Sequence, residues 1–178
     1  MNCFRKWKKL FWSSKQNFKD KEIIGDFIQF ESRPSHGKVW ATWGSSYIPL
    51  PKFLAAKKAI INRNNENDEC FKWAIIRALN SVKIHPERID KKLRETSKTL
   101  NWEKLKFPVK FSDINKFEEH NSSISVNVFG YEKLVYPLRI SEHNYKREST
   151  VNHLLISDDT NQHFCWIKDI SQLLSKQI

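Results

Sequence analysis

A change of hydrophobic period near residue 121 constrains the fold of this chain more than any other feature of its sequence. Ahead of it, apolar residues recur at helical spacing, and after it they alternate with polar residues as in strands. The helical pattern is clearest over 71–79, where the apolar positions are Phe71, Ala74, Ile75, Ala78 and Leu79. Alternation is clearest over Ile124–Phe129. Helices followed by a run of strands predict an α+β fold with an antiparallel sheet.

The same two patterns predict the remaining elements of the fold. We expect further helices at about 52–58, 86–100 and 112–119, and a closing helical turn at 170–174. We expect further strands at 134–140, 151–157 and 163–168. Asp68 has the side chain of a good N-cap for the helix over 71–79. Pro86 suits the first position of the helix that follows.

Composition excludes several classes of protein. The chain has 178 residues, 39% of them hydrophobic and 13% aromatic, so it can bury a core and is not a disordered chain. It contains no apolar run of about 18 residues, so no membrane span is expected. Three widely spaced cysteines, with no CxxC pair, argue against a disulfide framework and a structural zinc site. We therefore expect an intracellular protein, cytosolic or nuclear.

The charge of the chain favours a polyanionic partner. Lys and Arg number 31 against 20 Asp and Glu, a formal net charge of +11. The first 22 residues are especially basic, and apolar residues there fall near helical spacing. Such a segment suits a phosphate backbone, an acidic protein or an anionic membrane surface, or packs its aromatics onto the domain. The expected nucleic-acid contacts are Arg5, Lys6, Trp7, Lys8, Lys9 and Trp12.

One pair of residues has the chemistry of a thiol hydrolase. Cys70 lies at the start of a predicted helix, and His163 lies far downstream on a predicted strand. A helix N-terminus favours a thiolate and offers backbone N–H groups to an oxyanion. A histidine on a strand then acts as base towards the thiol and as acid towards the leaving group. Cysteine before histidine, helix before strand, is the papain-like arrangement.

A hydrolase would also need a group that orients the imidazole, and Asp169 and Asn161 are the two candidates. The acidic residues around Cys70 oppose thiolate formation. The alternative is structural: Cys70 is a small buried hydrophobe and His163 a core histidine. The other histidines have no metal-ligand partner at a usual spacing, and no phosphate-binding loop is present, so we expect no metal or other cofactor.

Most of the chain from residue 44 resembles a domain found ahead of the family B DNA polymerase in Maverick/Polinton-type mobile elements. The resembling blocks are GSSYIPLP at 44–51, KKAIIN at 57–62, NDECFKWAIIRALN at 67–80, HPERI at 85–89, LNWEKLKFPV at 100–109, DINKFE at 113–118, ISVNVFGYE at 124–132, YPLRIS at 136–141 and HFCWIKDISQLL at 163–174. The first 43 residues fit less well. We therefore expect a basic leader over 1–43 and a single domain over 44–178. No polymerase carboxylates are present, so no polymerase activity is expected from this chain.

A weaker resemblance is to ovarian-tumour-type papain-like cysteine proteases, whose pattern is Asp-Gly-Asn-Cys-Leu-Phe and a late His-Tyr. The matching runs are NDECF at 67–71 and HF at 163–164. The resemblance implies Cys70 as nucleophile, His163 as base, and oxyanion support near Asn67 and Glu69, where this chain departs from the pattern. It implies a cysteine peptidase or deubiquitinase, active or degenerate, acting on ubiquitin-like or other proteins. The alternative is a non-catalytic DNA-binding or interaction module associated with a protein-primed polymerase.

Overall fold

The computed structural model describes residues 47–64, 67–82, 84–143, 146–158 and 161–175. The chain divides into two compact units, Met1–Val39 and Trp40–Ile178. All of the described residues belong to the second unit. The basic residues expected to contact nucleic acid, from Arg5 to Trp12, lie outside the described residues.

Five strands form one mixed sheet in the order β1-β5-β4-β2-β3. The strands are β1 Ile60–Ile61, β2 Ile124–Tyr131, β3 Val135–Arg139, β4 Ser149–Ser157 and β5 Gln162–Ile167. Their positions confirm the α+β class and the strands expected from the alternating pattern. The expectation of a purely antiparallel sheet is wrong at one pair, because β2 and β4 run parallel. Since β3 turns back beside β2, the next strand runs in the direction of β2 again and pairs with its other edge.

The helices are α3 Lys52–Ala56, α4 Cys70–Leu79, α5 Lys91–Ser97, α6 Ile114–His120 and α7 Ile170–Leu174. Glu69, and not Asp68 as expected, occupies the N-cap position of α4, without a side-chain cap hydrogen bond. The helix expected over 86–100 is shorter, because Asp90 caps α5 through a 2.7 Å hydrogen bond from the Leu93 amide. The segment before it, which contains Pro86, forms turns.

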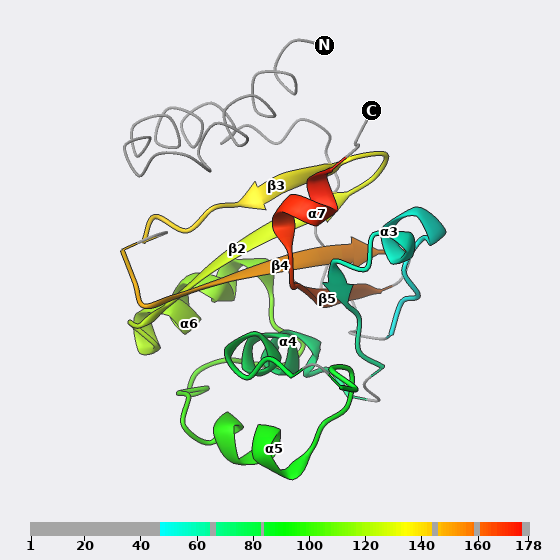
Figure 1. The fold of residues 1–178 in the computed structure, drawn as a ribbon. Helices are drawn as coiled ribbons and strands as arrows, with labels where there is room; N and C mark the ends of the chain where they lie inside the picture. Colours follow the sequence, from blue (N-terminus) through cyan, green and yellow to red (C-terminus); the bar gives the residue numbers. More distant parts are fainter. Residues whose placement is uncertain (1–46, 65–66, 83, 144–145, 159–160, 176–178) are drawn as a thin grey trace. The chain divides into compact units, whose positions relative to one another are not determined.

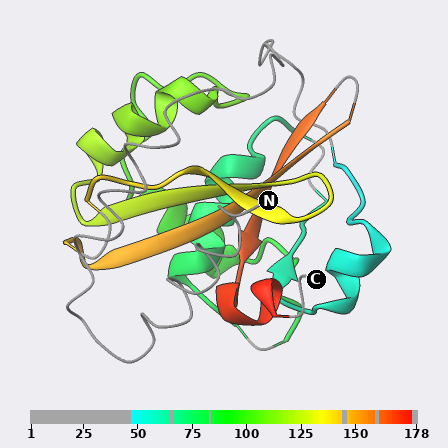
Figure 2. The same ribbon diagram turned by 90° about the horizontal axis from the view of Figure 1, so that it is seen from above.

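Helix α4 packs against β5 and β4, and α6 packs against β2 (Figure 1). Figure 1 shows both helices on one side of the sheet and α7 on the other. The ring of Phe71 on α4 lies in the middle of the contact between the helices and the sheet. It makes edge-to-face contacts with Phe117, His153 and Phe164. Seen from above, α6 and α3 lie on opposite sides of this unit (Figure 2). The main core therefore lies between α4, α6 and the sheet.

Candidate functional site

Cys70 lies where the sequence places it, as the first residue of α4, and it reaches the backbone of β5. Its Sγ accepts a hydrogen bond from the Phe164 amide at 3.5 Å. The side chain is 4% exposed and belongs to the main core cluster. The thiol therefore contacts the backbone one residue beyond His163. A helix N-terminus and an amide donor both favour negative charge on sulfur, whereas the burial opposes it.

His163 lies on β5, but its side chain leaves the sheet on the face opposite to that of Phe164, because successive strand residues alternate. Phe164 faces α4, where it contacts Phe71. The His163 ring makes an edge contact with Tyr47 at 5.9 Å between centroids. Within the described part of the chain neither ring nitrogen has a hydrogen-bond partner. The Cys70–His163 hydrogen bond that the hydrolase chemistry requires is therefore not made in this structure.

Burial also sets the protonation state of His163. The side chain is 0% exposed, and burial lowers its pKa to about 4, although the nearby backbone of Arg63 opposes part of this shift. The Arg63 backbone is thus close to the ring without forming a hydrogen bond of normal geometry. At neutral pH the ring is an uncharged member of the core.

The two expected orienting residues take part in local backbone structure. Asp169 is the N-cap of α7, and its Oδ1 accepts from the Gln172 amide at 2.8 Å. Asn161 closes a turn with Asp158, whose Oδ1 accepts from the Asn161 amide at 2.7 Å. Neither residue is shown hydrogen-bonded to His163, whose ring nitrogens have no partner among the described residues.

The residues expected at an oxyanion site form a small network ahead of α4. Asn67 donates from Nδ2 to Glu69 Oε2 at 3.0 Å, and its Oδ1 accepts from the Glu69 amide at 3.4 Å. Glu69 also accepts from Lys72 Nζ and from Trp73 Nε1. The Glu69 amide, expected as an oxyanion donor, therefore already has an acceptor in Asn67. The carboxylate of Glu69 itself lies beside it.

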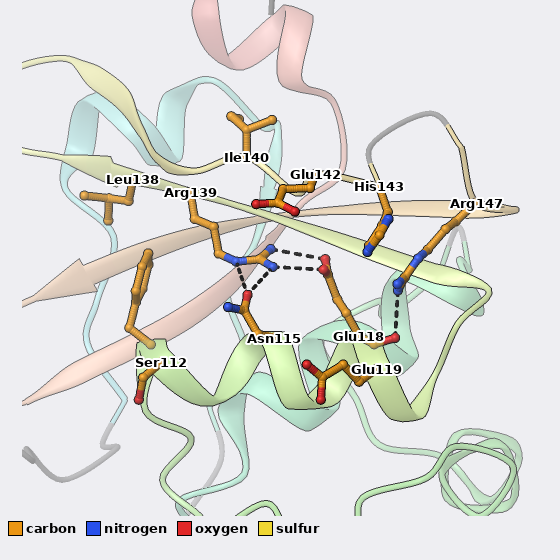
Figure 3. A pocket seen from close by; sticks show the side chains of 11 residues that line it. Ser112, Asn115, Glu118, Glu119, Leu138, Arg139, Ile140, Glu142, His143 and Arg147 are labelled. Atoms are coloured by element: carbon orange, nitrogen blue, oxygen red, sulfur yellow. Dashed lines mark hydrogen bonds and ion pairs between the residues drawn. The ribbon is translucent and has the colours of Figure 1, made fainter. Parts of the chain in front are cut away.

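A separate pocket of about 420 Å³ lies between α6 and β3 (Figure 3). Its volume falls in the range of small-molecule sites. No motif in the sequence pointed to its lining residues, which are Phe111, Ser112, Asn115, Glu118, Glu119, Leu138, Arg139, Ile140, Glu142, His143 and Arg147. Basic and acidic side chains both face it, so the lining does not select a ligand of one charge.

An ion pair at the back of this pocket joins α6 to the sheet. Arg139 Nη1 and Nη2 donate to the two carboxylate oxygens of Glu118, at 3.1 and 2.9 Å (Figure 3). Glu118 Oε1 also accepts from the Val126 amide at 2.6 Å. Burial disfavours the carboxylate, but the hydrogen bonds from Arg139 and Val126 prevail and hold the pKa of Glu118 below its usual value. Arg139 also donates to Asn115, so its donors are occupied within the protein.

A basic surface that was not expected from the sequence runs over α5 and the segment that follows it. Helix α5 lies on the side of α4 away from the sheet (Figure 1). The exposed cations of this basic surface are Lys91, Lys92, Arg94, Lys98, Lys104, Lys106 and Lys110. Only two acids, Glu95 and Glu103, share the segment. No ion pair joins any of these cations to a described residue. The excess of cations over 91–110 was the signal available in the sequence.

The described residues also bear on metal binding and on membranes. Among them, no three His, Cys, Asp or Glu side chains gather in a way that could hold a metal ion. Within the same residues, no helix has both the length and the apolar character needed to cross a bilayer.

Comparisons with models of known protein families, with curated proteins and with solved structures found no match to this chain.

Proposed function

We propose that this chain is a non-catalytic module that binds nucleic acid through its phosphate backbone. The observation that carries the proposal is the basic surface over residues 91–110, whose cations have no ion-pair partners among the described residues. Exposed cations without internal partners are available to neutralise phosphates and release counterions. The net charge of +11 adds long-range attraction.

Two further features support this proposal. Cys70 is 4% exposed and His163 is 0% exposed, so a protein substrate has little access to either side chain. The resemblance to a domain upstream of a DNA polymerase favours DNA as the polyanion. On this proposal the basic leader, with Arg5, Lys6, Trp7, Lys8, Lys9 and Trp12, provides a second set of contacts.

Salt-dependent DNA binding tests the proposal. Fluorescence anisotropy with a labelled duplex, from about 50 to about 200 mM salt, gives the slope of log K against log salt. The triple variant Lys104→Gln, Lys106→Gln, Lys110→Gln removes three exposed cations of the basic surface. If each contacts a phosphate, the slope becomes shallower by about 2.7. Affinity should fall by a similar factor for unrelated DNA sequences, because phosphate contacts carry no base specificity.

A matched control removes the same charge elsewhere. Lys58, Lys133 and Lys168 are exposed and make no ion pair with a described residue. Their replacement by Gln should leave the slope within about 0.5 of the wild-type value. Equal reductions of the salt slope in both triple variants would mean that only the net charge of the protein determines its affinity for DNA. That result would reject the basic surface as the binding site. Absence of binding even at low salt would reject the function.

The cysteine peptidase or deubiquitinase hypothesis remains as a second candidate, because the Phe164 amide donates to Cys70 Sγ at the start of α4. Its test is the rate of Cys70 alkylation against pH, measured by mass spectrometry in wild type and in His163→Ala. A reaction midpoint well below about 8.5 that returns to this value in the variant would favour a coupled pair. An unreactive Cys70 in both proteins would reject the hydrolase.

A further inference from the structure

Two arginine side chains, Arg63 and Arg77, are buried as neighbours although both carry positive charge. Arg63 follows β1 and is 5% exposed, and Arg77 lies in the last turn of α4 and is 1% exposed. The Arg63 guanidinium stands over the ring of Trp73, 5.8 Å from its centroid. Trp73 and Arg77 are four residues apart and therefore share a face of α4. The two guanidinium groups thus occupy one side of this helix.

The hydrogen bonds of these arginines leave several donors unused. Arg77 donates from Nη1 to the carbonyl of Asn80 at 3.3 Å and from Nη2 to the carbonyl of Arg88. Its Nε is buried and has no partner in the described part of the chain. Arg63 Nε and Nη1 are likewise buried without a partner among these residues. Buried polar groups in native proteins are almost always hydrogen-bonded, so three unmet donors in one place need an explanation.

The positive charges of Arg63 and Arg77 are also poorly compensated by nearby acids. Burial, and then the charge of Arg77, lower the pKa of Arg63 to about 10, so Arg63 stays protonated at neutral pH. The acids that act on it are Asp90 and Glu87, whose side chains are 52% and 49% exposed. Asp90 lies 3.9 Å from Arg77 Nη2, and its other oxygen caps α5. Burying two cations is costly without a well-placed anion.

We propose that Arg63 and Arg77 form a binding site for an oxyanion, with a phosphate group as the ligand. Guanidinium groups are strong donors to phosphate oxygens, and Nε of Arg77 with Nε and Nη1 of Arg63 are the donors that have no partner among the described residues. Arg77 lines a surface pocket of about 40 Å³ together with Asn80, Asp90 and Lys92, which gives a ligand oxygen access to Arg77, and Arg63 lies behind this opening without lining it. Trp73 adds an aromatic surface beside the site. This inference does not depend on the proposed binding of nucleic acid.

Thermal unfolding of the whole chain in phosphate and in chloride of equal ionic strength tests the site. Phosphate at ten times its dissociation constant should raise the Tm of the wild type by about 3–6 °C over chloride. In Arg63→Met this difference should disappear, apart from the general stabilisation by phosphate that acts on any protein. In chloride the variant should unfold at or above the wild-type Tm, because an uncompensated buried cation has been removed.

Lys133→Met is the matched control, because Lys133 is exposed, lies outside the basic surface and makes no ion pair with a described residue. It should keep the full wild-type response to phosphate. Equal responses in wild type and Arg63→Met overturn the proposal. Calorimetric titration of the wild type with inorganic phosphate decides the matter should Arg63→Met fail to fold. Absence of saturable heat at millimolar phosphate then overturns it too.

The same variants identify the source of the phosphate. If Arg63→Met weakens binding of a single-stranded oligonucleotide as well as of inorganic phosphate, the oxyanion is a backbone phosphate. If it loses phosphate alone and keeps the wild-type affinity for DNA, the site takes a free phosphate-bearing molecule such as a nucleotide. The basic-surface variants change DNA binding without changing the response to phosphate, so failures of the two proposals are distinguishable.

Discussion

His153 and His163 make the stability of this domain sensitive to acid. Both are 0% exposed, and none of their ring nitrogens has a partner among the described residues. Burial lowers the pKa of His153 from 6.5 to about 3 and that of His163 to about 4. The unfolded chain therefore binds more protons below pH 6.5, so the stabilisation is complete above that pH and is lost towards the folded values. At pH 5 each histidine should lower the free energy of unfolding by up to about 2 kcal/mol.

Urea unfolding from pH 7.5 to pH 4.5 measures this loss. His153→Leu, in the contact with Phe71 and Phe164, should flatten the profile by about one proton. Val151→Ala is the control, because it removes a buried apolar group of the same strand and no titratable one, so it should lower the free energy of unfolding at every pH and leave the slope unchanged. A His153→Leu profile as steep as the wild type would show that this histidine is not buried as a neutral ring.

At the scale of single elements, the ion pair of Glu118 and Arg139 determines how α6 sits on the sheet. Glu118 on α6 accepts hydrogen bonds from both β3 and β2. Glu118→Gln should lower the free energy of unfolding by about 3 kcal/mol, because the charge of Arg139, whose side chain is only 13% exposed, would lose its partner. The neighbouring Glu119→Gln changes an exposed carboxylate and should stay within about 0.5 kcal/mol. Denaturant unfolding compares them, and equal effects would contradict the structural role of the pair.

The hairpin of β2 and β3 depends on the absence of a side chain at Gly130. A Cβ there would lie 2.9 Å from Tyr136 Cζ and 3.0 Å from Leu138 Cδ1. Gly130→Ala should therefore cost about 1–2 kcal/mol, since those side chains must shift. The measurement is denaturant unfolding, with Gly130→Ala in a Tyr136→Ala background as the control. In that background, Gly130→Ala should lower the free energy of unfolding by less than it does in the wild type. An equal loss in both backgrounds would mean that the added methyl group does not clash with Tyr136.

Periodicity predicts which segments form elements but not which elements are neighbours. The helical face of α4 and the strands from β2 to β5 follow directly from residue spacing. The parallel pairing of β2 with β4 does not, because alternation defines the two faces of a strand and not its partners.

The candidate hydrolase site depended on which residues of β5 face α4. Both faces of β5 are buried, as shown by His163, Phe164, Cys165 and Trp166. The pattern of apolar residues therefore does not distinguish the face that points to α4. Residue spacing therefore placed Cys70 at a helix start and His163 on a strand, but it did not predict that Phe164, and not His163, faces α4. The start of α5 was also not predictable from residue spacing. The sequence suits a helix that begins at Pro86, and only the structure shows that Asp90 is the N-cap.

At the scale of the whole molecule, two basic segments contribute to the charge of +11, the leader and the basic surface. If the two contact different phosphates, the counterions they release add. Replacing Lys6, Lys8 and Lys9 by Gln should reduce the salt slope for duplex DNA by about 2.7, and combining this with the basic-surface triple variant should reduce it by about 5.4. Stability should change little, because exposed lysines of the basic surface make no ion pair with a described residue. A combined loss no larger than either alone would show that the two segments compete for the same phosphates, so that the leader substitutes for the basic surface instead of extending it.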